Sequence, residues 1–189
     1  GGAIKTFAGS ARLAVRNSTL TQNRAASRGG GLFEQGTQSA SLLNTIVADN
    51  SSPIATDVSG TFVDQGGNLI GVSDGAIGLT NSTLVGAAAS PIDPGLAPLA
   101  DNGGLTRTHL LRVDSVAANA GRATNLPTVD QRGQVRFFGS NVDIGAVELG
   151  VDVPAPSGTS PGVPVTTSLS DDSMNGPIND PTHSSTSLD

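Results

Sequence analysis

The sequence repeats one nine-residue frame, which consists of Gly, then Ser or Thr, then six residues, then Asn. Its three copies start 27 and then 24 residues apart and read GSARLAVRN at 9–17, GTQSASLLN at 36–44 and GTFVDQGGN at 60–68. A repeat of this length is typical of chains in which each structural unit packs only on its neighbours. The frame therefore predicts a stacked architecture rather than a single closed core.

Each repeated unit contains about three short β-type runs separated by Gly, Asn or Ser. None of the runs has a 3.6-residue apolar period long enough for a helix. A unit of this size cannot close a core alone, but it can when successive units stack with paired strands about 4.8 Å apart. We therefore predict an all-β fold, a right-handed parallel β-helix (solenoid) of about three coils with a C-terminal cap and a disordered tail.

Glycine and asparagine recur at the same places in the units, where a coil has to turn sharply. Both residues tolerate the left-handed backbone conformation that such turns require, and asparagines at equivalent places can bond to each other along the stack. The predicted turn and ladder residues are Gly9, Asn17, Asn23, Gly30, Gly31, Gly36, Asn44, Asn50, Gly60 and Asn68.

Alignment of the first two units predicts three pairs of inward-facing residues. The pairs are Leu13 over Ala40, Val15 over Leu42, and Leu20 over Val47. The third unit has Asp64 and Gly66 at the corresponding inward positions. We expect either a shifted register or a degraded last coil there.

The repeat predicts three regions along the chain. Residues 1–90 are the coils, and residues 91–149 are a cap that covers the open end of the stack. In this cap, Asp130 and Asp143 are expected to bond turn amides and to pair with Arg132, which would fix the cap on the coils. Residues 150–189 are rich in Pro, Ser, Thr and Asp, and they are expected to be a disordered linker or tail.

Composition excludes several classes of function. The 10 basic and 16 acidic residues give a net charge of −6, which argues against a nucleic-acid partner. The chain has no cysteine, and no apolar stretch approaches the length that crosses a membrane. Because it begins with Gly and not Met, we interpret it as a fragment of a longer precursor whose upstream coils would contact the first coil.

Further motifs along the chain resemble those of a known group. In order they are DVSGTF, GGNLIG, DPGLAPLADNGG, TRTHLL, VDQRG and VDIGAVELG. This series resembles the C-terminal part of bacterial surface proteins with right-handed parallel β-helix repeats, of the choice-of-anchor domain type, over about residues 1–150. A looser similarity is to bacterial polymorphic outer-membrane adhesins, although Leu20 and Val47 replace the Phe of their Phe-x-x-Asn motif. The resemblance implies a secreted or cell-surface location, an anchor signal further along the chain, and no established chemistry.

Several residue patterns invite a functional interpretation, but a structural one is favoured for each. The triplets at Asn17, Asn50 and Asn81 fit glycan acceptors, yet these residue types are also typical of β-turns. The run RGGGLFEQG lacks the Lys-Ser/Thr and the helix of a phosphate-binding loop. His109 has no carboxylate partners for a metal site that the sequence can place.

Enzymes with this fold that act on acidic polysaccharides need clustered carboxylates. Here Asp171 and Asp172 are adjacent only in the predicted tail, and the acidic residues of the repeats, Glu34, Asp49, Asp57 and Asp64, lie on different strands. The sequence thus predicts no catalytic residue, cofactor or metal in this segment.

We interpret the segment as non-catalytic, structural or adhesive, with an outward face of Ser, Thr, Asn and Gln that binds polysaccharide or another cell surface. The alternative is that it belongs to a pectate-lyase-like carbohydrate-active enzyme whose catalytic coils lie upstream.

Overall fold

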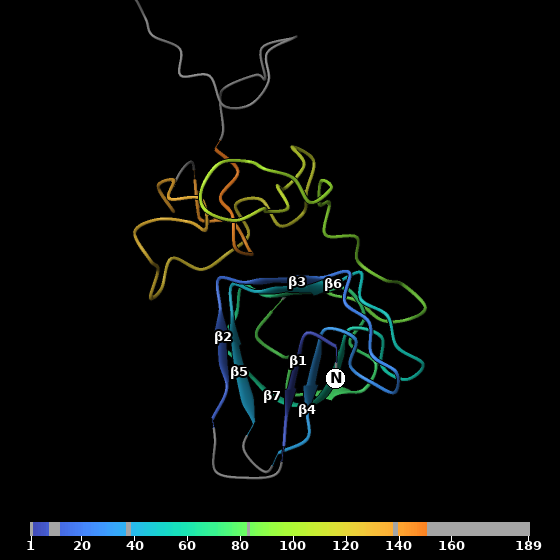
Figure 1. The fold of residues 1–189 in the computed structure, drawn as a ribbon. Helices are drawn as coiled ribbons and strands as arrows, with labels where there is room; N and C mark the ends of the chain where they lie inside the picture. Colours follow the sequence, from blue (N-terminus) through green and yellow to red (C-terminus); the bar gives the residue numbers. More distant parts are fainter. Residues whose placement is uncertain (1, 8–11, 37–38, 83, 138–139, 151–189) are drawn as a thin grey trace, which may run out of the picture.

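The computed structural model describes residues 2–7, 12–36, 39–82, 84–137 and 140–150. Gly9 and the predicted tail from residue 151 onward lie outside the described residues. The described chain contains short parallel strands and no helix (Figure 1). The strands are β1 (Ile4–Thr6), β2 (Ala14–Arg16), β3 (Thr19–Thr21), β4 (Leu32–Glu34), β5 (Ala40–Leu43), β6 (Ile46–Ala48), β7 (Val58–Asp64), β8 (Leu69–Ile70), β9 (Ala76–Ile77) and β10 (Leu84–Val85).

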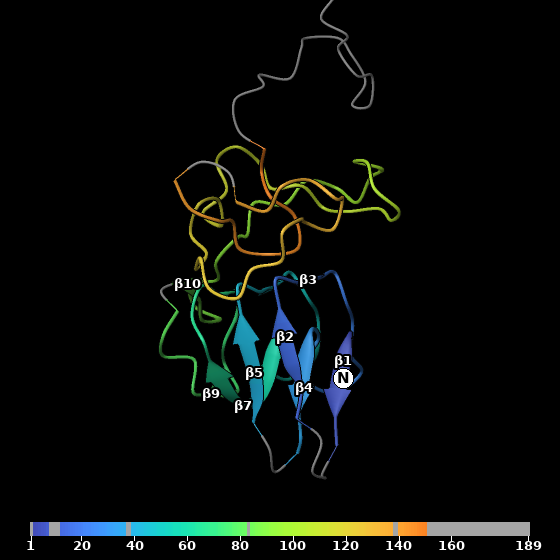
Figure 2. The same cartoon turned by 90° about the vertical axis from the view of Figure 1, so that its left-hand side faces the viewer.

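The strands stack coil over coil on three faces. The first face contains β1, β4 and the start of β7, the second contains β2, β5 and the end of β7, and the third has the order β10-β8-β6-β3. Figure 1 shows the three faces around the interior, and Figure 2 shows the strands of successive coils side by side. The predicted all-β stack of parallel strands is confirmed.

The first two coils pair as the repeat predicts. Val15 lies on Leu42 and Leu20 lies on Val47, each 27 residues further along the chain. Alternate residues of a strand face opposite sides of the sheet, and these four side chains lie on the inward side, where they pack in the core. The interior is completed by the buried residues Leu32, Ala40, Val58, Phe62 and Ile70.

The third coil has a different register from the one that the frame suggests. Ala40 pairs with Phe62, and Asp64 lies beside Leu42. The register differs because the second coil has a loop between β4 and β5, whereas β7 runs without a break from the first face to the second. Phe62 therefore fills the inward position that the frame had assigned to Asp64. A short fourth turn follows, with β9 on β7 and β10 on β8.

The C-terminal segment, which we define as residues 91–150, lies along the side of the stack. The repeat predicts a cap over the open end of the stack. Instead it packs on the outer face of the β10-β8-β6-β3 sheet, as both views show (Figures 1 and 2). This contact forms a second apolar core, made of Ile46, Ala48, Leu69, Leu111, Ala117 and Ile144.

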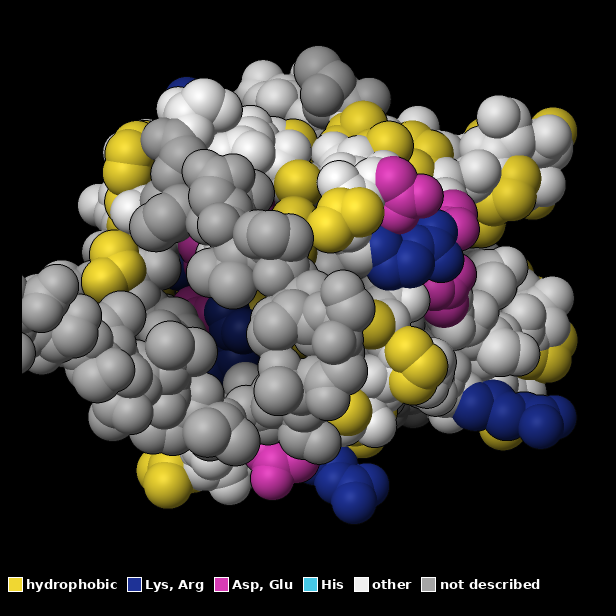
Figure 3. All heavy atoms as spheres, turned by 90° about the horizontal axis from the view of Figure 1, so that it is seen from above, with side chains coloured by type: hydrophobic (Ala, Val, Ile, Leu, Met, Phe, Trp, Pro, Cys, Tyr) yellow, Lys and Arg dark blue, Asp and Glu magenta, His cyan; other side chains and the backbone are white. Residues whose placement is uncertain are grey.

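Both faces of this sheet are therefore buried, which explains a local sequence feature. The run Ile46–Ala48 is fully buried and uninterrupted in its apolar character, whereas Thr19–Thr21 at the sheet edge alternates polar and apolar residues. A continuous apolar strand is what two buried faces require. Seen from above, the outer surface of the C-terminal segment shows hydrophobic side chains scattered among polar ones (Figure 3).

Candidate functional site

Two pairs of asparagine side chains join the first coil to the second. The side-chain amide of Asn23 donates to Oδ1 of Asn50 at 2.9 Å, and the backbone N–H of Asn23 donates to the same oxygen at 3.0 Å. The Asn44 amide donates to Oδ1 of Asn17 at 3.3 Å. Asn17 and Asn44 have φ angles of 45° and 47° at the corners between the second and third faces. The asparagines thus link the coils at their turns.

Gly30 and Gly31 lie where the second coil passes close to the third. Their N–H groups donate to the carbonyl oxygens of Thr56 and Asp57 at 2.8 and 2.9 Å. A Cβ on Gly30 would overlap the carbonyl oxygen of Thr56, so a side chain cannot be accommodated. These amides are used within the stack, which leaves them no role as a phosphate cradle.

The remaining predicted turn residues differ in their places. Gly36 follows β4, and its N–H donates to the carboxylate of Glu34. Gly60 lies inside β7 with a φ of 119°, rather than at the start of a separate turn. Asn68 is buried, and its Oδ1 accepts the N–H of Thr45 at 3.0 Å.

Two buried carboxylates connect the later coils. Asp57 accepts the backbone and side-chain N–H groups of Asn50 at 2.8 and 2.9 Å and the N–H of Val72 at 2.8 Å. Burial raises the pKa of Asp57, and these hydrogen bonds offset the rise only in part. Asp64 accepts five hydrogen bonds of 2.7–2.9 Å, which come from Gly66, Asn68, Asn81 and, twice, Ser82.

The C-terminal segment contains a network of buried charges. Nη2 of Arg132 lies 2.8 Å from Oδ2 of Asp130, as the sequence suggests. Asp143 is not paired with Arg132 but lies near Arg136, whose Nη2 donates to the Asp143 carbonyl at 3.2 Å. Arg136 Nε lies 3.8 Å from Oε2 of Glu148, and both side chains are almost completely buried. Two guanidinium groups thus share one interior with three carboxylates.

The pKa values in this network reflect burial first. Burial lowers the pKa of Arg136, while the charge of Glu148 raises it. The pKa of Asp143 is raised because burial outweighs the hydrogen bonds that it accepts. Burial also acts to raise the pKa of Asp130, but hydrogen bonds from the Glu148 N–H and from Arg132 outweigh it and leave the pKa lowered.

The C-terminal segment is tied to the stack by other residues than the predicted Asp130, Arg132 and Asp143, which bond mainly within the segment. Oδ1 of Asn44 accepts the N–H of Arg122 at 2.7 Å, and the Asn44 carbonyl accepts the N–H of Gly145 at 3.0 Å. The Thr19 hydroxyl accepts the N–H of Ala146 at 3.0 Å.

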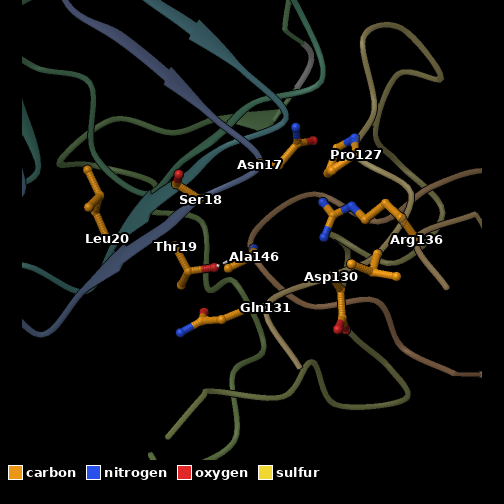
Figure 4. A pocket seen from close by; sticks show the side chains of 10 residues that line it. Asn17, Ser18, Thr19, Leu20, Pro127, Asp130, Gln131, Arg136 and Ala146 are labelled. Atoms are coloured by element: carbon orange, nitrogen blue, oxygen red, sulfur yellow. Dashed lines mark hydrogen bonds between the residues drawn. The ribbon is translucent and has the colours of Figure 1, made fainter. Parts of the chain in front are cut away.

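A cleft of about 520 Å³ lies between the first coil and the C-terminal segment. It is lined by Asn17, Ser18, Thr19, Leu20, Pro127, Val129, Asp130, Gln131, Arg136 and Ala146. In Figure 4 the Arg136 guanidinium points toward the first coil, and the amide of Asn17 and the hydroxyls of Ser18 and Thr19 lie on the opposite side. Arg136 and Asp130 are almost completely buried, so the accessible hydrogen-bonding groups are those of residues such as Asn17, Ser18 and Gln131, which suit an uncharged polar group such as a sugar hydroxyl. The excess of carboxylates behind Arg136 is unfavourable for an anion.

The sequence analysis assigned no contact to Arg122, Arg136 or Glu148. For Arg136 and Glu148, however, the sequence contains a pattern that indicates burial. Arg136 precedes two phenylalanines, and Glu148 lies in the run GAVELG, so each interrupts an apolar stretch. A charge in an apolar stretch is rarely buried unless it is paired, and two such charges indicate a buried pair.

The asparagines of the triplets that fit glycan acceptors take part in the structure, as the favoured interpretation predicts. The Asn50 side chain is buried and bonded to Asp57, and the Asn81 amide donates to the Asp64 carbonyl at 2.7 Å. His109 bonds through Nδ1 to the Ala97 carbonyl at 2.7 Å. Among the described residues, no group of three acidic or histidine side chains is placed to hold a metal ion, and no helix could span a membrane.

Comparison with known proteins gives no match, since no family model, no curated protein and no solved structure is similar to this chain.

Proposed function

We propose that this chain is a segment of a right-handed parallel β-helix with a structural and adhesive role at a bacterial cell surface. The observation that carries this proposal is that the buried carboxylates of the stack are occupied by hydrogen bonds between its turns. Asp57 and Asp64 accept hydrogen bonds from residues of neighbouring turns, so their oxygens hold the coils together. A carboxylate engaged in this way is poorly suited to accept a proton from a substrate or to attack one.

Two arguments support the handedness and the location. Connections between parallel strands of one sheet are right-handed in about 98% of cases, because strand twist favours that hand. The order of the motifs from DVSGTF to VDIGAVELG resembles choice-of-anchor surface proteins. We infer from the resemblance that the segment is exposed outside the cell.

The surface available for binding differs from the polar face expected from composition. Of the predicted asparagines, Asn44, Asn50 and Asn68 are buried. The outward positions of paired strands hold Lys5 beside Phe33 and Ser41 beside Val63. The third face is covered by the C-terminal segment. Adhesion would therefore use the first and second faces, together with the cleft beside Arg136.

Beads coated with the full chain provide the test. We expect them to adhere to surfaces that display polysaccharide, and we expect incubation to leave the soluble polysaccharide at its original length. Chain-length analysis by size-exclusion chromatography checks the second point. Cleavage of a polysaccharide by the purified chain would overturn the proposal in favour of a carbohydrate-active enzyme, and a failure to adhere to any surface would remove the adhesive role.

A further inference from the structure

The charges of this chain are separated along its sequence. Residues 1–33 contain five basic residues and no acidic one, whereas residues 34–106 contain seven acidic residues and no basic one. All five cations are exposed, and none takes part in an ion pair within the described ranges. They are Lys5, Arg12, Arg16, Arg24 and Arg28. The first coil therefore carries unneutralised positive charge on a chain that is acidic overall.

Two of these cations lie at a groove on the outer side of the first face. Lys5, Phe33 and Ser59 occupy paired positions on β1, β4 and β7, so the groove crosses the strands from coil to coil. It has a volume of about 660 Å³, and Arg28 and Gly75 also line it. Such a groove follows the direction in which the coils stack and has the shape to receive an extended chain.

Phe33 holds both cations in place. The Lys5 ammonium lies 5.1 Å from the centre of the Phe33 ring, and the Arg28 guanidinium carbon lies 5.8 Å from it. Lys5 also lies 4.6 Å from the ring centre of Phe7. Contacts between a cation and an aromatic face restrict the flexible side chains and leave their outer N–H groups available. Two positive charges are thus positioned beside one ring before any ligand arrives.

Glu34 is the one acidic residue in the lining of the groove, and it is buried, with its carboxylate accepting the N–H of Gly36. Apart from the two cations, the other residues that line the groove carry no charge. Ser27 and Gln35 line it beside the two cations, and both are exposed. Hydroxyl and amide groups of this kind bond to sugar hydroxyls, while Lys5 and Arg28 complement carboxylates or sulfates. A nucleic acid fits less well, because it needs a series of phosphate contacts and the later coils are acidic.

We propose that this groove binds a linear anionic polysaccharide. Its acidic groups lie at Lys5 and Arg28, its hydroxyls meet Ser27 and Gln35, and the polymer runs across β1, β4 and β7. This inference rests on the adhesive function proposed above and specifies the ligand class of that surface.

The test measures binding of the full chain to alginate, a linear polyuronate, at low salt. The Lys5→Gln/Arg28→Gln variant removes both groove cations, which are exposed, so the fold should persist. The matched control is Arg12→Gln/Arg16→Gln, which removes the same charge from the same coil outside the groove. We expect the groove variant to bind at least about tenfold more weakly, because two charge-assisted contacts are lost. The control should change affinity by less than about threefold, and raising the salt from about 20 to about 150 mM should weaken wild-type binding.

Other outcomes overturn the inference. Equal losses in the two double variants would show that net charge, rather than the groove, attracts the polymer. Tighter binding of polyglutamate or single-stranded DNA than of alginate would show that the groove does not recognise a polysaccharide. A further outcome is that the wild type fails to bind alginate while beads coated with it still adhere to neutral polysaccharide. In that case the inference would fail and the proposed adhesive function would stand.

Discussion

The coil stack and the C-terminal segment satisfy their backbones in different ways. In the stack, each strand pairs with the equivalent strand of the next coil, and apolar residues fill the interior. In the C-terminal segment, the described residues form only isolated bridges such as Leu96 with Leu111, and buried carboxylates accept the N–H groups of the turns. The comparison teaches that stacked strands find their backbone partners in the next coil, whereas turns depend on carboxylates. These are Asp57 and Asp64 in the later coils, and Asp130 and Asp143 in the C-terminal segment, where turns take the place of strands.

The largest expected effect is the loss of the buried guanidinium from the C-terminal segment. Arg136→Met leaves Glu148 and Asp143 without their cation, and we expect a loss of about 3–5 kcal/mol in the free energy of unfolding. Urea denaturation measures it. Arg112→Met is the control, because Arg112 forms two solvent-exposed ion pairs in the same segment, and its loss should destabilise the fold far less than Arg136→Met. Similar losses in the two variants would contradict the claim that buried charges stabilise this segment.

The second-largest effect is expected at the contact between the coil stack and the C-terminal segment. Gly145 has a φ of 110°, and a Cβ there would lie 2.8 Å from the Thr19 hydroxyl and 2.9 Å from Ile46 Cδ1. Gly145→Ala should cost about 2–4 kcal/mol, because backbone strain and overpacking add. Gly133→Ala is the matched control, since Gly133 has a φ of 84° but no neighbour within 4 Å. Faster proteolysis of the C-terminal segment in Gly145→Ala, but not in Gly133→Ala, would show that the contact with the stack is weakened. Equal unfolding midpoints for the two variants would contradict the prediction.

A moderate, pH-dependent effect is expected in the stack. Burial acts to raise the pKa of Asp64, but the hydrogen bonds from Ser82, Gly66, Asn68 and Asn81 outweigh it, so the folded-state pKa lies below the usual 3.8. The Asp64 carboxylate therefore stabilises the fold above pH 3.8, and this contribution is lost as the pH falls through the folded-state value.

Asp64→Asn tests this sign. At pH 7 we expect a loss of about 1–3 kcal/mol, because five hydrogen bonds to a carboxylate are weakened or broken. The difference from the wild type should shrink as the pH falls below 3.8, which thermal unfolding at a series of pH values measures. A difference that stays constant down to pH 2 would show that Asp64 does not titrate in this way.

The smallest effect is expected at the edge of the asparagine ladder. Asn23 is half-buried in the first coil, so Asn23→Ala should cost about 0.5–1 kcal/mol. Asn50 is buried and bonds to Asn23, Asp57 and two carbonyl groups, so Asn50→Ala should cost about 1–3 kcal/mol. Equal costs in denaturation experiments would show that the ladder does not gain strength from partners on both sides.

The parts of the fold that depend on the repeat could be predicted, and the parts that depend on an exception to it could not. The pairs Val15–Leu42 and Leu20–Val47 follow from a constant spacing of 27 residues. The third coil could not be placed, because it lacks the loop that precedes β5 in the second coil, and this changes the spacing without changing the pattern of Gly and Asn. Phe62 and Asp64 then occupy inward positions two residues away from those expected.

The candidate site was predicted even less completely, for a different reason. Asp130 and Arg132 are close in sequence, and their pairing was predicted. Asn44 and Arg122 are 78 residues apart, and nothing in the local pattern relates them. The cleft beside Arg136 and the groove beside Phe33 are likewise built from distant segments, so they appear only when the chain is folded.

By itself, the sequence determined that the chain stacks in parallel coils, because the spacing of Gly, Asn and inward apolar residues fixes which strands can pair and which side chains face inside. Only the tertiary structure decided that the C-terminal segment covers a side of the stack rather than its end. The physical reason lies in Ile46, Ala48 and Leu69, whose outward side chains form an apolar surface that needs a cover. A local pattern shows that such a strand is apolar on both faces, but it does not show which distant segment will bury the second one.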